Sequence, residues 1–315
     1  MIARVLTIGE GLGIVRARGI GTLDTVSDMV LSTGGAEVNV AIGLARLGTA
    51  VTWIGRVGND AVGRRVVREL RAEGVDVIAP IDPAGATGVL LKSTPAPGRT
   101  DVVNLRVGSA GSRLEMADLD AVNIRDYGVL HVTGITPALS RSAAAAVTEL
   151  MARARRADVL VSVDVNHRSR LWSDSAEAVT SHLALTAGAD ILFAGDDEAR
   201  LLVGGTGTPE ELAAALQLRG PSQVVIKLGA LGAIALENGV VRRCAAQPVE
   251  VVDTVGAGDA FVAGYLAEVL RGEAVQQRLR VATIAGAAAC SNPGDWEGAP
   301  SWAELERVHA DPVNR

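Results

Sequence analysis

Several features that define other protein classes are scarce in this chain. Among 315 residues it has only two cysteines, Cys244 and Cys290, whose separation fits neither a disulfide framework nor a metal-ligand spacing. We expect both to be buried, reduced thiols. No apolar run approaches the roughly 20 residues of a membrane span, and the first residues lack the apolar core and cleavage site of a signal peptide. The sequence therefore predicts a soluble protein of the reducing cytoplasm.

A surplus of positive charge is also absent. The formal net charge is −6, with 30 Lys and Arg against 36 Asp and Glu. This balance argues against a general nucleic-acid or membrane surface and leaves only local anion sites. The chain contains no G-x-x-x-x-G-K-[ST] motif, and GEGLG at 9–13 lacks the spacing and following helix of a dinucleotide fingerprint. Any phosphate must therefore be bound by another arrangement of donors.

The apolar residues that are present fall into short strand-like runs between helical stretches. Near-continuous Val/Ile/Leu runs indicate parallel strands that are buried on both faces. Together they predict a doubly wound α/β fold with a mainly parallel sheet. The expected strands are 4–9, 50–58, 127–134, 158–166, 189–195 and 222–229. The expected helices are 36–48, 60–73, 140–156, 174–187, 196–203, 208–219, 257–271 and 274–290.

Two stretches interrupt this alternation. Residues 12–33 and 76–113 are rich in turns and alternate in polarity, which is typical of antiparallel hairpins. Inserted into an α/β core, they predict a small β-sheet lid beside the carboxyl edge of the main sheet.

The strongest motif is VVDTVGAGDAFVAGYLAEVL at 251–270, a short strand followed by a glycine-rich turn and a helix. Gly256, Ala257 and Gly258 allow a close approach of the backbone, and the helix start offers free amides and a positive dipole end to an anion. Asp259 falls in the first helical turn. In isolation it is equally explained as an acidic residue stabilised by the helix dipole.

A second motif, GGAEVNVA at 34–41, places two glycines before a helix. Gly34 and Gly35 permit a tight approach of backbone to a ligand, and Asn39 has both a donor and an acceptor for a sugar hydroxyl. By itself this motif is no more than a plain helix entry.

Together the two motifs resemble the two signatures of the ribokinase-like, or PfkB, carbohydrate kinases, and the resemblance covers nearly the whole chain. It implies a single ribokinase-like kinase domain over residues 1–315 that transfers the γ-phosphoryl group of ATP to a sugar. In this family the amides of Gly256, Ala257 and Gly258 would form the anion hole and Asp259 would be the catalytic base. Gly34, Gly35 and Asn39 would contact the sugar.

Other segments match the nucleotide side of the family. IKLGALGA at 226–233 resembles the segment that lies along ATP, which assigns Lys227, Gly229 and Gly232 to the cofactor. A solvated lysine beside a turn is the alternative. The family motif N-x-x-E, which organises Mg²⁺ through water, is altered: Glu198 matches, but Gly195 replaces the asparagine. Glu198 also fits an ordinary helix-start acid, and a monovalent cation is a further possible cofactor.

The segments VVNLRVGSAG and DVNHRSRLW look most like those of 2-keto-3-deoxygluconate kinases. That substrate is a carboxylate, which a planar guanidinium binds through two parallel hydrogen bonds. The resemblance assigns this role to Arg106 and Arg168, each of which also fits a surface arginine. Tyrosines common near the first arginine are replaced by Leu91, Asn104 and Leu105. A fructokinase or another hexose, pentose or nucleoside kinase is therefore the alternative, and a non-catalytic sugar- or nucleotide-binding regulator is the alternative of another class.

The mechanism expected from this resemblance directs a primary hydroxyl at Asp259. A helix start should lower the pKa of Asp259, so we expect its orientation to matter more than its basicity. The lid would exclude water from the bound sugar. Pairing of two lids would also cover their strand edges, which makes a homodimer plausible.

Overall fold

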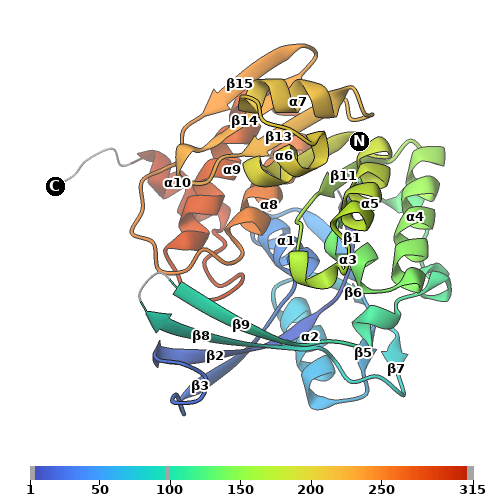
Figure 1. Cartoon of the computed structure of the whole chain (residues 1–315), viewed down its shortest axis with the longest axis vertical. Coiled ribbons are helices and arrows are strands. Elements are labelled where there is room, and N and C mark those ends of the chain that lie inside the picture. Colours follow the sequence, from blue (N-terminus) through green and yellow to red (C-terminus); the bar gives the residue numbers. More distant parts are fainter. Residues whose placement is uncertain (1–3, 97–98, 311–315) are drawn as a thin grey trace.

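The computed structural model describes residues 4–96 and 99–310, and its centre is a nine-stranded sheet (Figure 1). The strand order is β15-β14-β13-β12-β11-β10-β1-β4-β6. All neighbours from β13 to β6 pair in parallel, whereas β14 and β15 add an antiparallel edge. The strands of this sheet are β1 (Arg4–Ile8), β4 (Ala50–Ile54), β6 (Asp76–Ile78), β10 (Val129–Thr133), β11 (Leu160–Asp164), β12 (Ile191–Gly195), β13 (Gln223–Lys227), β14 (Ala233–Glu237) and β15 (Val240–Cys244).

Helices cover both faces of the sheet. The core on one face includes residues of α1, α2, α8, α9 and α10, and the core on the other includes residues of α4, α5, α6 and α7. In β13, Val225 faces the first core while Val224 and Ile226 face the second. This alternation explains why the strands are apolar throughout. The helices are α1 (Ala36–Arg46), α2 (Ala61–Ala72), α3 (Ile135–Leu139), α4 (Arg141–Arg156), α5 (Ser175–Ala187), α6 (Asp196–Val203), α7 (Pro209–Gln217), α8 (Ala257–Leu270), α9 (Val275–Cys290) and α10 (Trp302–Ala310).

The doubly wound α/β fold predicted from the sequence is confirmed. All eight expected helices are present with closely matching ends. The sequence reasoning missed the hairpin of β14 and β15, which begins after a turn at Gly229–Leu231, and it missed the short helices α3 and α10. It also expected buried, reduced thiols at Cys244 and Cys290: both are free, as expected, but they are only half-buried.

A separate four-stranded sheet lies beside the main one (Figure 1). Its order is β3-β2-β8-β9; β2 pairs with β8 in parallel, and the outer pairs are antiparallel. The strands are β2 (Leu12–Ile20), β3 (Met29–Gly34), β8 (Val89–Ala96) and β9 (Arg99–Leu105). Residues 97–98, in the expected turn of the second hairpin, lie outside the described residues.

The expected extent of this smaller sheet, 76–113, was too wide. β6 belongs to the edge of the main sheet, where Val77 packs against the core, and β7 (Ile81–Asp82) pairs with β5 (Val57–Gly58) in a sheet of their own. Residues Gly111–Arg113 form a short 3-10 turn. In the described part of the chain, no helix is long and apolar enough to cross a membrane.

Asp60 connects the helical layer to the smaller sheet. It caps α2 by accepting a hydrogen bond from the Gly63 amide at 2.7 Å, and its other oxygen accepts from the Thr87 amide at 2.7 Å, just before β8. Burial would raise the pKa of Asp60, but these backbone hydrogen bonds outweigh burial and lower it.

We predict that Asp60→Ala lowers the free energy of unfolding by about 1–2 kcal/mol at pH 7. Because the folded pKa lies below the unfolded one, this contribution is present above the ordinary aspartate pKa and is lost as pH falls through the lowered value. Urea unfolding at pH 7 and at pH 3 measures the difference. Asp60→Asn keeps an acceptor oxygen and serves as the control; a loss that is the same at both pH values would contradict the assignment.

Candidate active site

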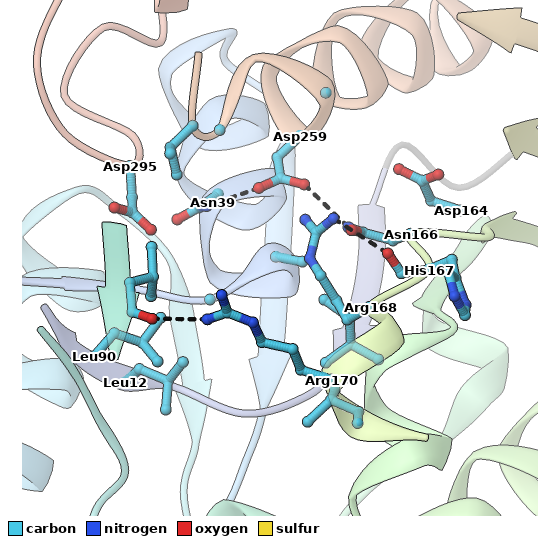
Figure 2. A pocket seen from close by; sticks show the side chains of 18 of the residues that line it. Leu12, Asn39, Leu90, Asp164, Asn166, His167, Arg168, Arg170, Asp259 and Asp295 are labelled. Atoms are coloured by element: carbon cyan, nitrogen blue, oxygen red, sulfur yellow. Dashed lines mark hydrogen bonds between the residues drawn. The ribbon is translucent and has the colours of Figure 1, made fainter. Parts of the chain in front are cut away.

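A cavity of about 650 Å³ lies between the smaller sheet and the ends of the parallel strands (Figure 2). Its walls come from β8 and β9, from the ends of β11, β12 and β13, from the loop after β11, and from the first turns of α1, α6 and α8. The carboxyl ends of parallel strands are the usual ligand site in open α/β sheets. The two signature motifs, although about 220 residues apart in the chain, therefore meet at one cavity.

The start of α8 is shaped for an anion. Gly256 has a φ of 76° and caps the helix, and a β-carbon there would overlap the carbonyl oxygen of Asp295. The first amides of a helix have no intrahelical acceptor. Gly256 and Gly258 line the cavity, whereas Ala257 does not, and the Ala257 amide lies 3.4 Å from the Thr254 carbonyl oxygen. An anion in the cavity would thus face the amides around Gly258.

Asp259 points into the cavity from the first turn of α8, and only 8% of its surface is exposed. Asn39 Nδ2 donates a hydrogen bond to Asp259 Oδ2 at 2.7 Å, and Asn166 Nδ2 lies 3.5 Å from Oδ1 (Figure 2). Burial raises the pKa of Asp259 to about 7, helped by the negative charge of Asp164 and opposed by the Asn39 hydrogen bond. The expectation of a lowered pKa was wrong, because the loss of hydration on burial is the largest effect on this carboxyl group.

The first signature supplies the opposite wall. Gly35, with a φ of 129°, lines the cavity, and a β-carbon there would overlap the Glu10 carbonyl oxygen. Gly34 lies behind it and packs against the Asp295 carboxylate. While its amide nitrogen is bonded to Asp259, Asn39 has a buried Oδ1 with no partner among the described residues. That oxygen is available to a hydroxyl of a bound ligand.

On the side away from the smaller sheet, Lys227 Nζ donates to both oxygens of Asp164 at 2.7 and 2.8 Å. Burial acts to lower the pKa of Lys227, but the neighbouring Asp164 and Glu198 carboxylates raise it by more. The pKa is therefore raised overall, and the amine stays charged. Gly229 and Gly232 do not line the cavity; they shape the turn after β13, and a β-carbon at Gly232 would overlap the Cys244 carbonyl oxygen.

Glu198 lines the cavity from the start of α6, and both of its oxygens are occupied by backbone amides. Oε1 accepts from His167 at 2.7 Å and Oε2 accepts from Gly195 at 2.7 Å. Glu198 therefore caps α6, which is the role of an ordinary helix-start acid that the sequence also allowed. Among the residues that the structure describes, no three acidic, histidine or cysteine side chains are grouped to hold a metal ion.

The arginines of the cavity differ in their partners. Arg106 is nearly buried and forms an ion pair with Glu10, whose pKa is raised by burial and lowered in part by this arginine. Arg168 and Arg170 contact main-chain oxygens instead: Arg168 that of His167 at 3.5 Å, and Arg170 that of Val102 in β9 at 2.8 Å (Figure 2). Within the described chain, neither has a carboxylate in ion-pair contact.

The sequence predicted that Leu91, Asn104 and Leu105 replace tyrosines in the wall of the sugar pocket. Only one of these three residues lines the cavity. Leu90 and Asn104, which are paired across β8 and β9, line the cavity. Leu91 and Leu105 are not lining residues, because successive side chains of a strand point to opposite faces.

Sequence reasoning gave no role in the site to several lining residues that carry charged or polar groups. Asp164 had a recognisable signal, an acidic residue at the end of a buried strand, and so had Lys92, a single charge within the apolar run VLLKS. Asn166 is distinguished only by a left-handed φ of 39°, which the sequence does not reveal. Arg170 and Asp295 also belong to this group.

Known proteins are similar to this chain in sequence and architecture. The model of the pfkB family carbohydrate kinases matches residues 8–302. A 2-dehydro-3-deoxygluconokinase of Bacillus subtilis strain 168 is 38% identical over 95% of this chain and 93% of its own, and one of Thermoproteus tenax is 36% identical over 96% and 93%. An Escherichia coli protein solved in complex with ATP and Mg²⁺ is 26% identical, with a TM-score of 0.90 over 98% of this chain and 100% of its own. The chain belongs to the pfkB family and is an ATP-dependent carbohydrate kinase.

Proposed function

We propose that this kinase phosphorylates a primary hydroxyl of 2-keto-3-deoxygluconate, the acid also called 2-dehydro-3-deoxygluconate, with Asp259 as the base. The observation that carries this proposal is the buried Asp259 carboxylate beside the free amides of α8, in a cavity that also holds Arg168 and Arg170, neither of them in ion-pair contact with a carboxylate of the described residues. The names of the two relatives in Bacillus subtilis and Thermoproteus tenax support the choice of sugar.

In the proposed reaction the sugar hydroxyl oxygen forms a bond to the γ-phosphorus of ATP, and the bond from that phosphorus to the β,γ-bridging oxygen breaks. Asp259 receives the hydroxyl proton. The amides around Gly258 donate hydrogen bonds to the charge that develops on the phosphoryl oxygens. Asn39 holds Asp259 Oδ2, and Oδ1, which has Asn166 Nδ2 at 3.5 Å, is the oxygen proposed to face the hydroxyl.

A pKa near 7 suits this role. A general base works best when its pKa lies near the operating pH, because enough of it is ionised and it still binds a proton well. Burial supplies that pKa, and Asn39 prevents it from rising further. Asp259 therefore contributes both orientation and basicity.

The nucleotide is proposed to lie on the side of Lys227, whose amine stays charged and lies near Gly258. Bound Mg²⁺ would neutralise part of the phosphate charge. Magnesium usually keeps several waters and takes one or two carboxylates plus phosphate oxygens. Glu198, and Asp164 beside Lys227, would hold the ion through water, since the oxygens of both carboxylates already accept hydrogen bonds from the protein. Gly229 and Gly232 would act through the shape of the turn, and a monovalent cation is a further proposed cofactor.

For the acid group of the sugar, we favour Arg168, joined by Arg170, over Arg106. The positive charge of Arg106 is already matched by Glu10, whereas Arg168 and Arg170 keep charge that a substrate carboxylate can neutralise. Fructose is the second candidate acceptor, because Leu90 and Asn104 give the wall of β8 and β9 a neutral lining.

The smaller sheet is proposed to act as a lid, and pairing of two lids would make a homodimer.

The first prediction of this proposed function concerns the acceptor. In an ADP-release assay with ATP and Mg²⁺, 2-keto-3-deoxygluconate should give a higher kcat/KM than fructose, ribose or nucleosides. Arg168→Ala should raise the KM ratio of the acid sugar to fructose roughly tenfold to hundredfold, because a charge-assisted hydrogen bond is worth about 1.5–3 kcal/mol. Arg106→Ala, which leaves Glu10 buried without its partner, should weaken both acceptors alike. An equal effect of Arg168→Ala on both acceptors would remove the acid-sugar argument.

The second prediction concerns pH. Since only ionised Asp259 accepts a proton, kcat/KM should rise with pH through about 7 and then level off. Asn39→Ala removes a hydrogen bond that lowers this pKa, so the rise should move to higher pH. Phosphate groups themselves ionise near pH 6, so the shift between variant and wild type is the diagnostic quantity. Asn104→Ala, elsewhere on the wall, is the control, and an unmoved midpoint in Asn39→Ala would refute the assignment.

A further inference from the structure

Two histidines contact each other at the edge of the cavity. His167, in the loop after β11, lines the cavity, and Figure 2 shows it on the same side as Asp164, away from Asp295. His182 of α5 does not line the cavity and is only 1% exposed. His167 Nδ1 and His182 Nε2 lie 3.1 Å apart, and the two rings meet edge to face. Neither histidine belongs to a signature motif, and the proposed reaction uses neither.

The protonation of His182 decides the protonation of His167. A hydrogen bond between two neutral imidazoles has one N–H donor and one lone-pair acceptor, so the proton position on one ring fixes that on the other. Burial, and next the charge of His167, lower the pKa of His182 to about 4, so His182 is neutral at pH 7. Its single proton lies either on Nε2, toward His167, or on Nδ1.

The surroundings of His182 Nδ1 favour a lone pair at that atom. Nδ1 is buried without a partner among the described residues, and so is Nε1 of Trp172, whose ring centroid lies 5.7 Å from that of His182. An indole nitrogen can only donate. A proton on Nδ1 would therefore add a second buried donor without an acceptor, which costs free energy. A lone pair on Nδ1 instead places an acceptor in the ring that packs against the indole.

Gly134 supports the same assignment independently. A β-carbon on Gly134 would lie 2.5 Å from His182 Nδ1, so a hydrogen on the Gly134 α-carbon is directed at this edge of the ring. Such C–H groups are weak donors that contact acceptors. Nδ1 of His182 is therefore unprotonated, and the proton lies on Nε2.

This assignment gives His167 a defined donor. Since His182 Nε2–H donates to His167 Nδ1, a neutral His167 carries its own proton on Nε2. That nitrogen has no side-chain partner in the described structure and is not one of its buried, unpaired atoms. The main-chain amide of His167 donates to Glu198 Oε1 at 2.7 Å, which holds the residue at the start of α6.

We propose that His167 Nε2–H donates a hydrogen bond to a phosphate oxygen of the bound nucleotide, and that His182 is a positioning residue that fixes this tautomer of His167. The opposite tautomer would turn a lone pair toward the phosphate oxygens and repel them. The contact rests on the proposed placement of the nucleotide beside Lys227 and Glu198. It does not depend on which sugar is the acceptor.

The tautomer is tested directly by two-bond ¹H–¹⁵N correlation spectra of the ¹⁵N-histidine-labelled enzyme at pH 8. The chain has four histidines, and the spectra of His167→Gln and His182→Leu assign the two that matter. We expect the proton on Nε2 in both rings. Addition of Mg²⁺ and the β,γ-imido analogue of ATP should shift the Nε2 resonance of His167. A His167 that carries its proton on Nδ1 in the wild type would overturn the proposal.

Nucleotide affinity tests the phosphate contact. His167→Gln and His182→Leu should each raise the Kd of the β,γ-imido analogue about tenfold in calorimetry with Mg²⁺, the scale expected for a hydrogen bond to a charged group. His182→Gln, whose amide keeps a donor near the position of Nε2, should restore the affinity to within about twofold of the wild type. The KM of the preferred sugar should stay within about twofold in all three variants.

Leu185→Ala is the matched control, because it removes another buried side chain of α5 that does not line the cavity. It should leave both the His167 tautomer and the nucleotide Kd unchanged, and thermal unfolding checks that each variant folds. The proposal is overturned if His182→Leu leaves the nucleotide Kd unchanged, if His182→Gln weakens the nucleotide as much as His182→Leu, or if the sugar KM rises in parallel. None of these outcomes depends on the identity of the sugar, so they are separate from the test of the proposed acceptor.

Discussion

The hydrogen bond between Asn39 and Asp259 is the contact on which the site depends. It joins the first turns of α1 and α8, whose sequences are 220 positions apart, at a distance of 2.7 Å. The two helices approach closely because small residues meet between them, with Gly43 of α1 against Ala263 of α8. Helices α1 and α8 therefore set the distance between the sugar wall and the proposed base.

Burial of α8 gives Asp259 its chemistry. From Asp259 to Val269 every residue of this helix is buried, between α1 and α9. Loss of hydration raises the pKa of the carboxyl group to about 7, against the effect of the Asn39 hydrogen bond and of the charges of Arg168 and Lys227. A carboxylate at an exposed helix start would remain fully ionised at this pH but would be a weak proton acceptor. The packing of α8 thus sets the basicity of the Asp259 carboxylate.

The other buried charges of the cavity come in matched pairs, each joining different parts of the fold. Lys227 pairs with Asp164 across β13 and β11, Arg106 with Glu10, and Lys92 with Asp295. Matched pairs avoid the cost of isolated buried charge. They also leave Arg168 and Arg170 as the arginines of the described cavity wall that are not in ion-pair contact with a carboxylate.

The sequence predicted those features that depend on residues close together in the chain. Glycines before α1 and α8 and the apolar runs of the strands located both signatures and the sheet, because turn geometry and periodicity act over a few residues. The direction of the Asp259 pKa shift was predicted wrongly, since burial depends on α1 and α9, which a local motif does not contain. The partners of Arg106 and Lys92 were also beyond reach, because Glu10 and Asp295 lie far from them in the sequence. A single lysine in an apolar strand was nevertheless a signal that a buried partner must exist.

The most direct measurement is the turnover of Asp259→Asn with its preferred sugar, ATP and Mg²⁺, together with the KM of each substrate. Asparagine keeps the size of the side chain and cannot take the hydroxyl proton. If Asp259 is the base, kcat falls by about 10²- to 10⁴-fold while the two KM values stay near those of the wild type. Turnover close to the wild-type rate would contradict the account.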